Sequence, residues 1–249
     1  MRILGIIPAR YASTRLPGKP LLEILGKTMI QRVYEQAKKA GSLHDVVVAT
    51  DDSRIFDHVK SFGGHVVMTA DVHPSGTDRC REALKLIKGD FAYVINIQGD
   101  EPMIDPQQID SLAAVLDGRV ELATLIKTAI DHDDIASHNA VKVVLNTQGE
   151  ALYFSRMMLP FVKGVEEKNW VTEHAYFLHV GMYAYRKDIL EAVTKLAVSS
   201  LEKAESLEQL RWLENGYKIK CVLTEIQGQC VDTPEDLEKV KQLLKAENA

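Results

Sequence analysis

Cysteine is scarce in this chain, with three residues among 249 and no C-x-x-C pair or Cys/His cluster. An odd, scattered set argues against a disulfide framework and against the usual zinc-ligand spacings. We therefore expect Cys80, Cys221 and Cys230 to be reduced and structural, as is typical of a cytoplasmic protein.

Long hydrophobic runs and an excess of basic charge are also missing. No stretch approaches the ~20 apolar residues of a membrane span, and the apolar run at the N-terminus ends at Arg10, so we expect neither membrane insertion nor a signal peptide. Thirty Lys and Arg against 35 Asp and Glu give a formal net charge of −5, which argues against a nucleic-acid partner. A small anionic ligand held by local cations remains compatible with that balance.

The first half of the chain alternates Val- and Ile-rich runs with amphipathic segments. We expect strands at residues 3–8, 45–49, 65–68 and 91–97, and helices at 28–40, 52–61, 78–86 and 106–116. Apolar strands separated by helices predict a parallel sheet covered on both faces. The chain is therefore expected to have a doubly wound α/β fold, which binds its ligands beyond the carboxyl ends of the strands.

The second half is less regular. We expect strands at 122–127, 141–145, 151–154, 177–186 and 218–224, and helices at 207–214 and 234–244. This pattern predicts a smaller mixed-strand insertion on a mostly parallel sheet, of the kind that often builds the second-substrate side or a dimer contact. The length suits one large domain, which we divide into a half at 1–130 and a half at 131–249.

The loop after the first strand, PARYASTRLPGKP at residues 8–20, is the most informative segment. It places Arg10, Arg15 and Lys19 at the carboxyl end of the strand, with hydroxyls and a flexible backbone at Ser13, Thr14 and Gly18. Two like charges about 4 Å apart repel by on the order of 4 kcal/mol at an effective dielectric near 20, and a bound triphosphate reverses that sign. A solvated loop whose cations pair with surface acids is the alternative.

Two familiar phosphate-binding motifs are absent. Gly26-Lys27-Thr28 resembles the end of a P-loop, but Leu21 stands where the first glycine is required. No G-x-G-x-x-G follows the first strand, which excludes the usual dinucleotide site and an NAD-linked oxidoreductase.

Asp100 and Asp232 are the candidate metal ligands. Asp100 follows the fourth expected strand in QGDEP, where a carboxylate faces the ligand crevice and suits a hard cation such as Mg²⁺; a turn acid is the alternative. In VDTPEDL, Thr233 and Asp236 have the spacing of a capping box. Capping leaves Asp232 without a structural task, which makes it the better ligand candidate.

Strings along almost the whole chain resemble the 3-deoxy-manno-octulosonate (KDO) cytidylyltransferase family of sugar nucleotidyltransferases. Besides ARYASTRLPGKPL, they are ATDD at 49–52, SGTDR at 75–79, INIQGDEP at 95–102, ALYFSR at 151–156, HVGMYAYR at 179–186, LEQLRWLENG at 207–216 and VDTPEDLEKV at 231–240. The resemblance implies a Rossmann-like nucleotidyltransferase fold, a homodimer, and Mg²⁺ held by Asp100 and Asp232. It also implies transfer of CMP from CTP to the anomeric hydroxyl of KDO for lipopolysaccharide biosynthesis.

The same resemblance assigns residues to the nucleotide. The positions matching its phosphate and base contacts are Arg10, Ser13, Thr14, Arg15, Lys19, Ser75, Gly76, Thr77, Arg79 and Gln98, and the catalytic group is Arg10, Lys19, Asp100 and Asp232. The residue types leave other roles open. Thr77 or Asp78 can cap the helix expected at 78–86, and Asp51 or Asp52 can cap the helix expected at 52–61. Glu101 can lie next to the metal ligands without binding the ion itself, or it can face solvent.

The sugar that would accept CMP carries a carboxylate, so its binding site also needs a cation. Arg156 and His179 match the positions that bind the sugar in the family, with Tyr185, Glu208 and Gln209 available for its hydroxyls. Arginine pairs bidentately with a carboxylate, which fixes orientation as well as charge. Taken alone, His179 on an apolar strand is typical of a core residue and Glu208 of a helix surface.

Two alternatives remain. The first is the same reaction on 8-amino-KDO or on another acidic sugar such as a sialic acid, although ALYFSR and LEQLR favour KDO over sialic acid. The second is a non-catalytic nucleotide-binding protein, against which the presence of both Asp100 and Asp232 argues.

Overall fold

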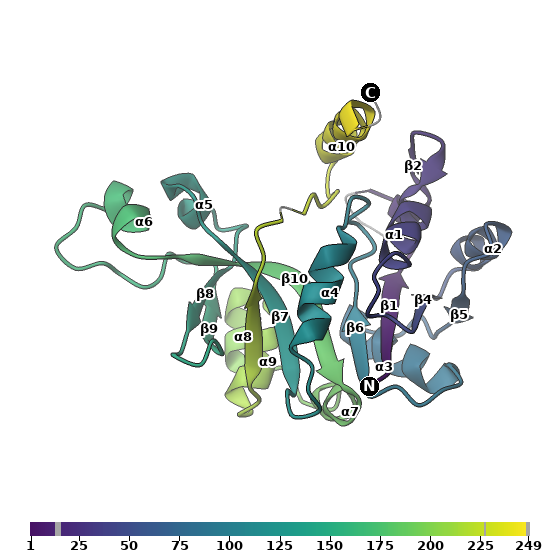
Figure 1. Cartoon of the computed structure of the whole chain (residues 1–249), viewed down its shortest axis with the longest axis horizontal. Coiled ribbons are helices and arrows are strands. Elements are labelled where there is room, and N and C mark those ends of the chain that lie inside the picture. Colours follow the sequence, from purple (N-terminus) through teal and green to yellow (C-terminus); the bar gives the residue numbers. More distant parts are fainter. Residues whose placement is uncertain (13–15, 227, 248–249) are drawn as a thin grey trace. The chain divides into compact units, whose positions relative to one another are not determined.

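The computed structural model describes residues 1–12, 16–226 and 228–247, which form two compact units (Figure 1). The first unit comprises Met1–Ala114 and Gln227–Ala249, and the second comprises Val115–Ile226. This division differs from the expected halves at 1–130 and 131–249, because the C-terminal segment packs with the first unit.

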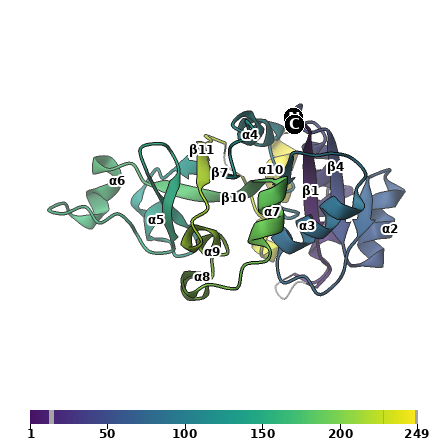
Figure 2. The same cartoon turned by 90° about the horizontal axis from the view of Figure 1, so that it is seen from below.

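The sheet of the first unit is parallel. It contains β1 (Ile3–Ala9), β4 (Asp45–Thr50), β5 (Val66–Met68) and β6 (Tyr93–Asn96), in the order β6-β1-β4-β5. The apolar strand residues are almost all buried, as their unalternated pattern predicts. The helices α1 (Met29–Ala37), α2 (Ser53–Ser61) and α3 (Gly76–Leu86) pack on this sheet, and Figure 2 shows α3 lying across β1. α4 (Pro106–Ala114) completes the predicted alternation.

Side-chain caps fix where these helices begin. Thr28 accepts a hydrogen bond from the Gln31 amide at the start of α1, and Asp52 accepts one from the Arg54 amide at the start of α2, so the prediction for Asp52 is confirmed. The prediction that Thr77 or Asp78 caps α3 is wrong. Ser75 is the cap, with its Oγ 3.2 Å from the Asp78 amide nitrogen, and the helix therefore begins at Gly76.

The expected long loop between β1 and α1 contains short ordered elements. They are a 3-10 turn at Lys19–Leu21, β2 (Glu23–Ile24) and β3 (Lys27–Thr28). Gly18 precedes the turn with φ +68°, a conformation that glycine adopts without steric cost, and its amide donates to the Tyr11 carbonyl at 3.1 Å. This closure aims Lys19 back toward the end of β1.

The second unit has mixed strands, as predicted. β10 (Phe177–Arg186) pairs antiparallel with β7 (Leu122–Thr128) and β8 (Lys142–Leu145), β8 pairs antiparallel with β9 (Ala151–Ser155), and β11 (Ile219–Leu223) runs parallel to β7. The helices are α5 (His132–Ala136), α6 (Trp170–Glu173), α7 (Lys187–Val193), α8 (Ser200–Glu205) and α9 (Gln209–Glu214), with a 3-10 turn at Glu167–Asn169. Of these, the sequence predicts only α9.

The last helix, α10 (Pro234–Glu247), belongs to the first unit, where it contacts β2. Val240 and Leu244 of α10 pack with Ile24, Met29 and Val231 in a buried cluster. The cluster fixes the chain on the C-terminal side of Asp232. No helix among the described residues has the length and apolarity needed to cross a membrane.

Leu244 and Leu243 provide a matched test of this packing, because they are neighbours on one helix with exposed fractions of 7% and 40%. Leu244→Ala should lower the free energy of unfolding by about 2–4 kcal/mol, since it opens a cavity in the cluster. Leu243→Ala should change it by less than about 0.5–1 kcal/mol. Urea unfolding measures both, and equal losses would contradict the assigned packing.

Candidate active site

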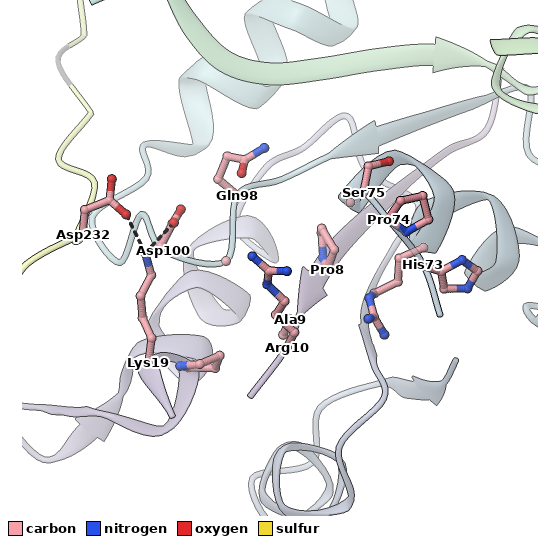
Figure 3. A pocket seen from close by; sticks show the side chains of 14 residues that line it. Pro8, Ala9, Arg10, Lys19, His73, Pro74, Ser75, Gln98, Asp100 and Asp232 are labelled. Atoms are coloured by element: carbon pink, nitrogen blue, oxygen red, sulfur yellow. Dashed lines mark hydrogen bonds and ion pairs between the residues drawn. The ribbon is translucent and has the colours of Figure 1, made fainter. Parts of the chain in front are cut away.

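The ends of β1 and β6 open into a cavity of about 330 Å³ in the first unit (Figure 3). This size is typical of a small-molecule site. It is lined by Pro8, Ala9, Arg10, Lys19, Pro20, His73, Pro74, Ser75, Gly76, Arg79, Gln98, Gly99, Asp100 and Asp232. The cavity therefore lies where a parallel α/β sheet is expected to bind its ligand.

Lys19 joins the two candidate metal ligands. Its Nζ lies 2.7 Å from Asp100 Oδ2 and 3.0 Å from Asp232 Oδ1, as the dashed lines in Figure 3 show. The Lys19 side chain is 14% exposed, against 26% for Asp100 and 38% for Asp232. Burial acts to lower the pKa of Lys19, but the charges and hydrogen bonds of the two aspartates outweigh it, so the pKa is raised above its ordinary value. The ammonium therefore stays charged at neutral pH.

Backbone geometry brings these acids together across 132 positions of sequence. Asp100 follows Gly99, where a Cβ would stand 3.0 Å from the Pro8 carbonyl oxygen; glycine thus lets the loop after β6 approach the end of β1. The amide of Val231 then donates to the Asp100 carbonyl at 2.9 Å. Asp232 is consequently anchored beside Asp100 by main-chain bonding, independently of the ion pairs.

The capping box after Asp232 is present as predicted. Asp236 accepts from the amide of Thr233 at 2.9 Å, and the Thr233 hydroxyl accepts from the amide of Asp236 at 3.2 Å. Asp236 also accepts from the amide of Asp232. The carboxylate of Asp232 faces Lys19, with Oδ1 3.0 Å from the ammonium.

The donor set fits a hard divalent cation. Ligand atoms of Asp100, Cys230 and Asp232 all lie within 4.8 Å of one another, and carboxylate oxygens are the ligands that Mg²⁺ prefers. Burial and the surrounding carboxylates raise the pKa of the Cys230 thiol, and a neutral sulfur is a poor ligand for such an ion. Of these three residues, Asp100 and Asp232, which already share one cation, are thus the suitable ligands.

Glu101 supports this acidic corner. Burial raises the pKa of Glu101 to about 7, and the charge of Asp100 adds to the effect. The carboxylate stands close to Gly228, where a Cβ would lie 3.0 Å from Oε2. Although its surface is not completely covered, the group is enclosed, which favours the supporting role over the solvent-facing one.

The opposite wall is formed by the segment before α3. Arg79 is buried, and it donates to Thr69 Oγ1 at 2.6 Å and to Asp51 Oδ2 at 2.7 Å, so it orients this segment while also lining the cavity. Thr77 is buried at the start of the helix and does not line the cavity, whereas Ser75 and Gly76 do.

His73 and Pro74 also line this wall, and the sequence did not predict them. The His73 imidazole pairs with Glu82, which also accepts from the amide of Ala70 at 3.0 Å. Only the fold brings these positions together, so no local pattern could have identified the pair.

Arg10 brings a second cation to the cavity. Figure 3 shows it between the Lys19 side and the wall that carries Ser75, with Gln98 across the opening. Of the other loop residues predicted to bind phosphate, Ser13, Thr14 and Arg15 lie outside the described residues.

The five residues predicted for the sugar all belong to the second unit. The His179 imidazole lies 3.1 Å from Thr124 Oγ1, with its ring edge-on to Phe154 and against Tyr183. Burial lowers the pKa of His179 to about 4, so the imidazole is neutral at pH 7. Tyr185 is fully buried, with its ring edge-on to Trp212.

The remaining three differ in exposure. Arg156 lines an open hollow of about 410 Å³ with His138, Tyr153, Met157, Ala204 and Glu205. Gln209 is 5% exposed, and its Nε2 has no hydrogen-bond partner among the described residues. Glu208 precedes α9 and is close enough to Tyr183 to influence its ionisation. Three of the five predicted residues, His179, Tyr185 and Glu208, therefore lie near Tyr183. Arg156 instead lines the open hollow.

Known proteins resemble the whole chain. The model of a family described as "Cytidylyltransferase" matches residues 4–219. Proteins named 3-deoxy-manno-octulosonate cytidylyltransferase are 54% identical in Cytophaga hutchinsonii, covering 96% of each chain, and 53% identical in Bacteroides thetaiotaomicron, covering 98% of this chain and 99% of that one.

Solved structures agree. A CMP:2-keto-3-deoxy-manno-octonic acid synthetase complexed with CTP has a TM-score of 0.92 at 43% identity, covering 99% of this chain and 100% of that chain. A cytidylyltransferase of Leptospira borgpetersenii shares the fold alone, with a TM-score of 0.63 at 19% identity over 99% of this chain and 87% of that one.

The lowered pKa of His179 predicts a pH-dependent loss of stability. Between about pH 6.5 and pH 4 the unfolded chain protonates this imidazole while the folded chain keeps it neutral, so stability falls as the pH falls. Because the side chain keeps some exposed surface, we expect a contribution on the order of 2 kcal/mol. Urea unfolding across this range should give a shallower pH dependence for His179→Gln than for the unchanged chain, and an identical pH dependence would contradict the assignment.

Proposed function

Because the chain belongs to the cytidylyltransferase family, we propose that it transfers CMP from CTP to the anomeric hydroxyl of KDO, releasing pyrophosphate. The observation that carries this proposal is the bridge from Lys19 to Asp100 and Asp232 at the mouth of the β1–β6 cavity. It joins a phosphate-binding cation to a pair of metal-binding acids. The CMP-KDO formed would supply lipopolysaccharide biosynthesis.

CTP binds in the cavity of the first unit. Arg10 and Lys19 face the triphosphate, while Gln98, Ser75 and Gly76 face the base and ribose. Cations aimed at phosphate oxygens in a partly enclosed site stabilise charge that develops as the leaving group departs. The roles of Ser13, Thr14 and Arg15 toward the phosphates stay predictions.

Asp100 and Asp232 would hold Mg²⁺. The ion, when bound, supplies polarisation of the α-phosphate and a lower pKa of the attacking hydroxyl. The protein's own contribution is to keep the two carboxylates converged, through the Val231–Asp100 main-chain bond and the Lys19 ammonium.

The reaction is an in-line displacement at phosphorus. The oxygen of the sugar's anomeric hydroxyl forms a bond to the α-phosphorus of CTP, and its proton passes to solvent water. The bond from that phosphorus to the bridging oxygen breaks, and pyrophosphate leaves with the electron pair. Positioning and charge stabilisation supply most of the rate enhancement in such transfers.

The acidic sugar is bound by the second unit. Arg156 pairs with its carboxylate, and the buried amide of Gln209, which lacks a partner among the described residues, offers a donor for a hydroxyl. His179, Tyr185 and Glu208 complete the predicted set. The homodimer and the cytoplasmic location also stay predictions.

A pyrophosphate-release assay tests the proposal. CTP, ATP, UTP and GTP are each combined with KDO, with 8-amino-KDO and with N-acetylneuraminate. We expect turnover with CTP and KDO to be at least about 100-fold above turnover with the other nucleotides, because a base that does not pair with the polar groups of Gln98 and Ser75 in the cavity leaves them unsatisfied. Equal rates with the 8-amino sugar would extend the acceptor range, whereas no release with any acceptor would favour the nucleotide-binding alternative.

Charge-matched variants place the reaction at this site within the same assay. Asp232→Asn and Asp100→Asn should each lower kcat by at least about 1,000-fold, since either removes a ligand of the cation that polarises the phosphate. Glu235→Gln removes the same charge from an exposed position three residues after Asp232 and should keep kcat within twofold. Near-normal turnover by either asparagine variant at saturating Mg²⁺ would contradict the role of that aspartate as a metal ligand.

A further inference from the structure

Lys142 is a buried cation in the second unit that the proposed function does not use. It lies on β8, opposite Ser155 of β9 and Leu178 of β10, and its side chain is fully covered. Burying a charged group costs several kcal/mol unless its hydrogen bonds are satisfied. A strand in the middle of a sheet could carry an apolar residue here at no such cost, so the lysine needs an explanation.

The ammonium group binds three backbone carbonyls. Lys142 Nζ donates to the carbonyl oxygens of Ser137 at 2.8 Å, Ala140 at 2.6 Å and Arg156 at 2.6 Å. A lysine has three donors, and all three are used. Burial lowers the pKa of Lys142, with the charge of Glu205 opposing that effect and the charge of Arg156 adding to it. One side chain thus ties the segment before β8 to the residue that follows β9.

Glu205 holds Arg156 from the other side. Its Oε2 accepts from the Arg156 amide at 2.9 Å, and its main-chain carbonyl accepts from the Arg156 Nε at 2.8 Å. Its Oε1 accepts from the Ser155 hydroxyl at 2.6 Å. Both the N–H and the C=O of Arg156 are therefore fixed, one by a carboxylate and the other by an ammonium.

These contacts leave part of the guanidinium available. Arg156 Nη1 donates to the carbonyl of His138 at 3.0 Å, whereas Nη2 makes no hydrogen bond to a described residue, and the group lines the 410 Å³ hollow. A guanidinium recognises a carboxylate through a planar fork, so its orientation decides the strength of the pair. Anchoring the backbone on both sides fixes that orientation before a ligand arrives.

We propose that Lys142 is a positioning residue that fixes Arg156 for the carboxylate of the acidic sugar. This inference rests on the proposed function, which assigns that carboxylate to Arg156. An apolar residue at this position would leave three carbonyls without this donor, so the lysine also stabilises the fold; a selective effect on the sugar KM separates the positioning role from that structural one. The three hydrogen bonds offset the cost of burying the charge, and they fix the binding group before the ligand arrives, which reduces the entropy lost on binding.

A double-mutant cycle tests this role. Lys142→Met, Arg156→Ala and the double variant are compared with the unchanged chain by steady-state kinetics for both substrates. Arg156→Ala should raise the sugar KM by about 10- to 100-fold, and Lys142→Met by about 10-fold, with the CTP KM within twofold in each. If Lys142 acts through Arg156, the double variant should be no worse than Arg156→Ala alone. Lys163→Met, an exposed lysine of the same unit, should leave both KM values unchanged.

The outcomes separate the inference from the proposed function. An unchanged sugar KM for Arg156→Ala would refute the acceptor assignment, and the inference with it. A normal effect of Arg156→Ala with multiplying effects in the double variant would overturn the inference alone. If Lys142→Met raised both KM values equally, the role of Lys142 would be merely structural, and this result would also overturn the inference.

Glu205→Gln keeps the test decisive if Lys142→Met does not fold. It weakens the contact with the Arg156 amide from the opposite side and keeps the shape of the side chain. A folded Glu205→Gln variant should again raise the sugar KM selectively by about 3- to 10-fold. An unaltered sugar KM would overturn the inference.

Discussion

The ammonium of Lys19 between Asp100 and Asp232 is the contact on which the site depends. Two carboxylates held this close would repel each other in a partly buried corner, and the lysine between them removes that repulsion. The same arrangement presents a cation to a phosphate and a pair of oxygen ligands to a metal ion. Lys19 therefore makes the site compatible with a stable fold and with highly charged ligands.

Three segments far apart in sequence build this contact, and main-chain geometry holds each of them. The left-handed Gly18 directs Lys19, Gly99 allows the loop after β6 to approach Pro8, and the amide of Val231 binds the carbonyl of Asp100. The second unit repeats the principle, since Lys142 and Glu205 fix the main chain of Arg156. In both units, a fixed main chain determines where the functional side chains lie.

Much of the fold is visible in the sequence, because buried parallel strands and amphipathic helices leave strong periodic patterns. The sequence does not predict α5, α6, α7 and α8, because segments of four to seven residues span at most about two helical turns and show the period weakly; α9 is equally short but is predicted. Capping explains Thr233 and Asp236 and leaves Asp232 as a ligand candidate, whereas its pairing with Asp100 was implied by the family resemblance. His73 and Lys142 could not be found in this way: a histidine that pairs with Glu82 and a lysine that binds three carbonyls look like ordinary polar residues until the chain is folded.

Anomalous diffraction from crystals grown with CTP and Mn²⁺, a spectroscopically visible substitute for Mg²⁺ with similar preferences for oxygen ligands, tests the central claim most directly. Manganese should appear in bonding contact with the carboxylates of Asp100 and Asp232, with Lys19 Nζ turned from one of them to a phosphate oxygen. Manganese bound elsewhere, with the Lys19 bridge intact beneath a bound nucleotide, would contradict the account.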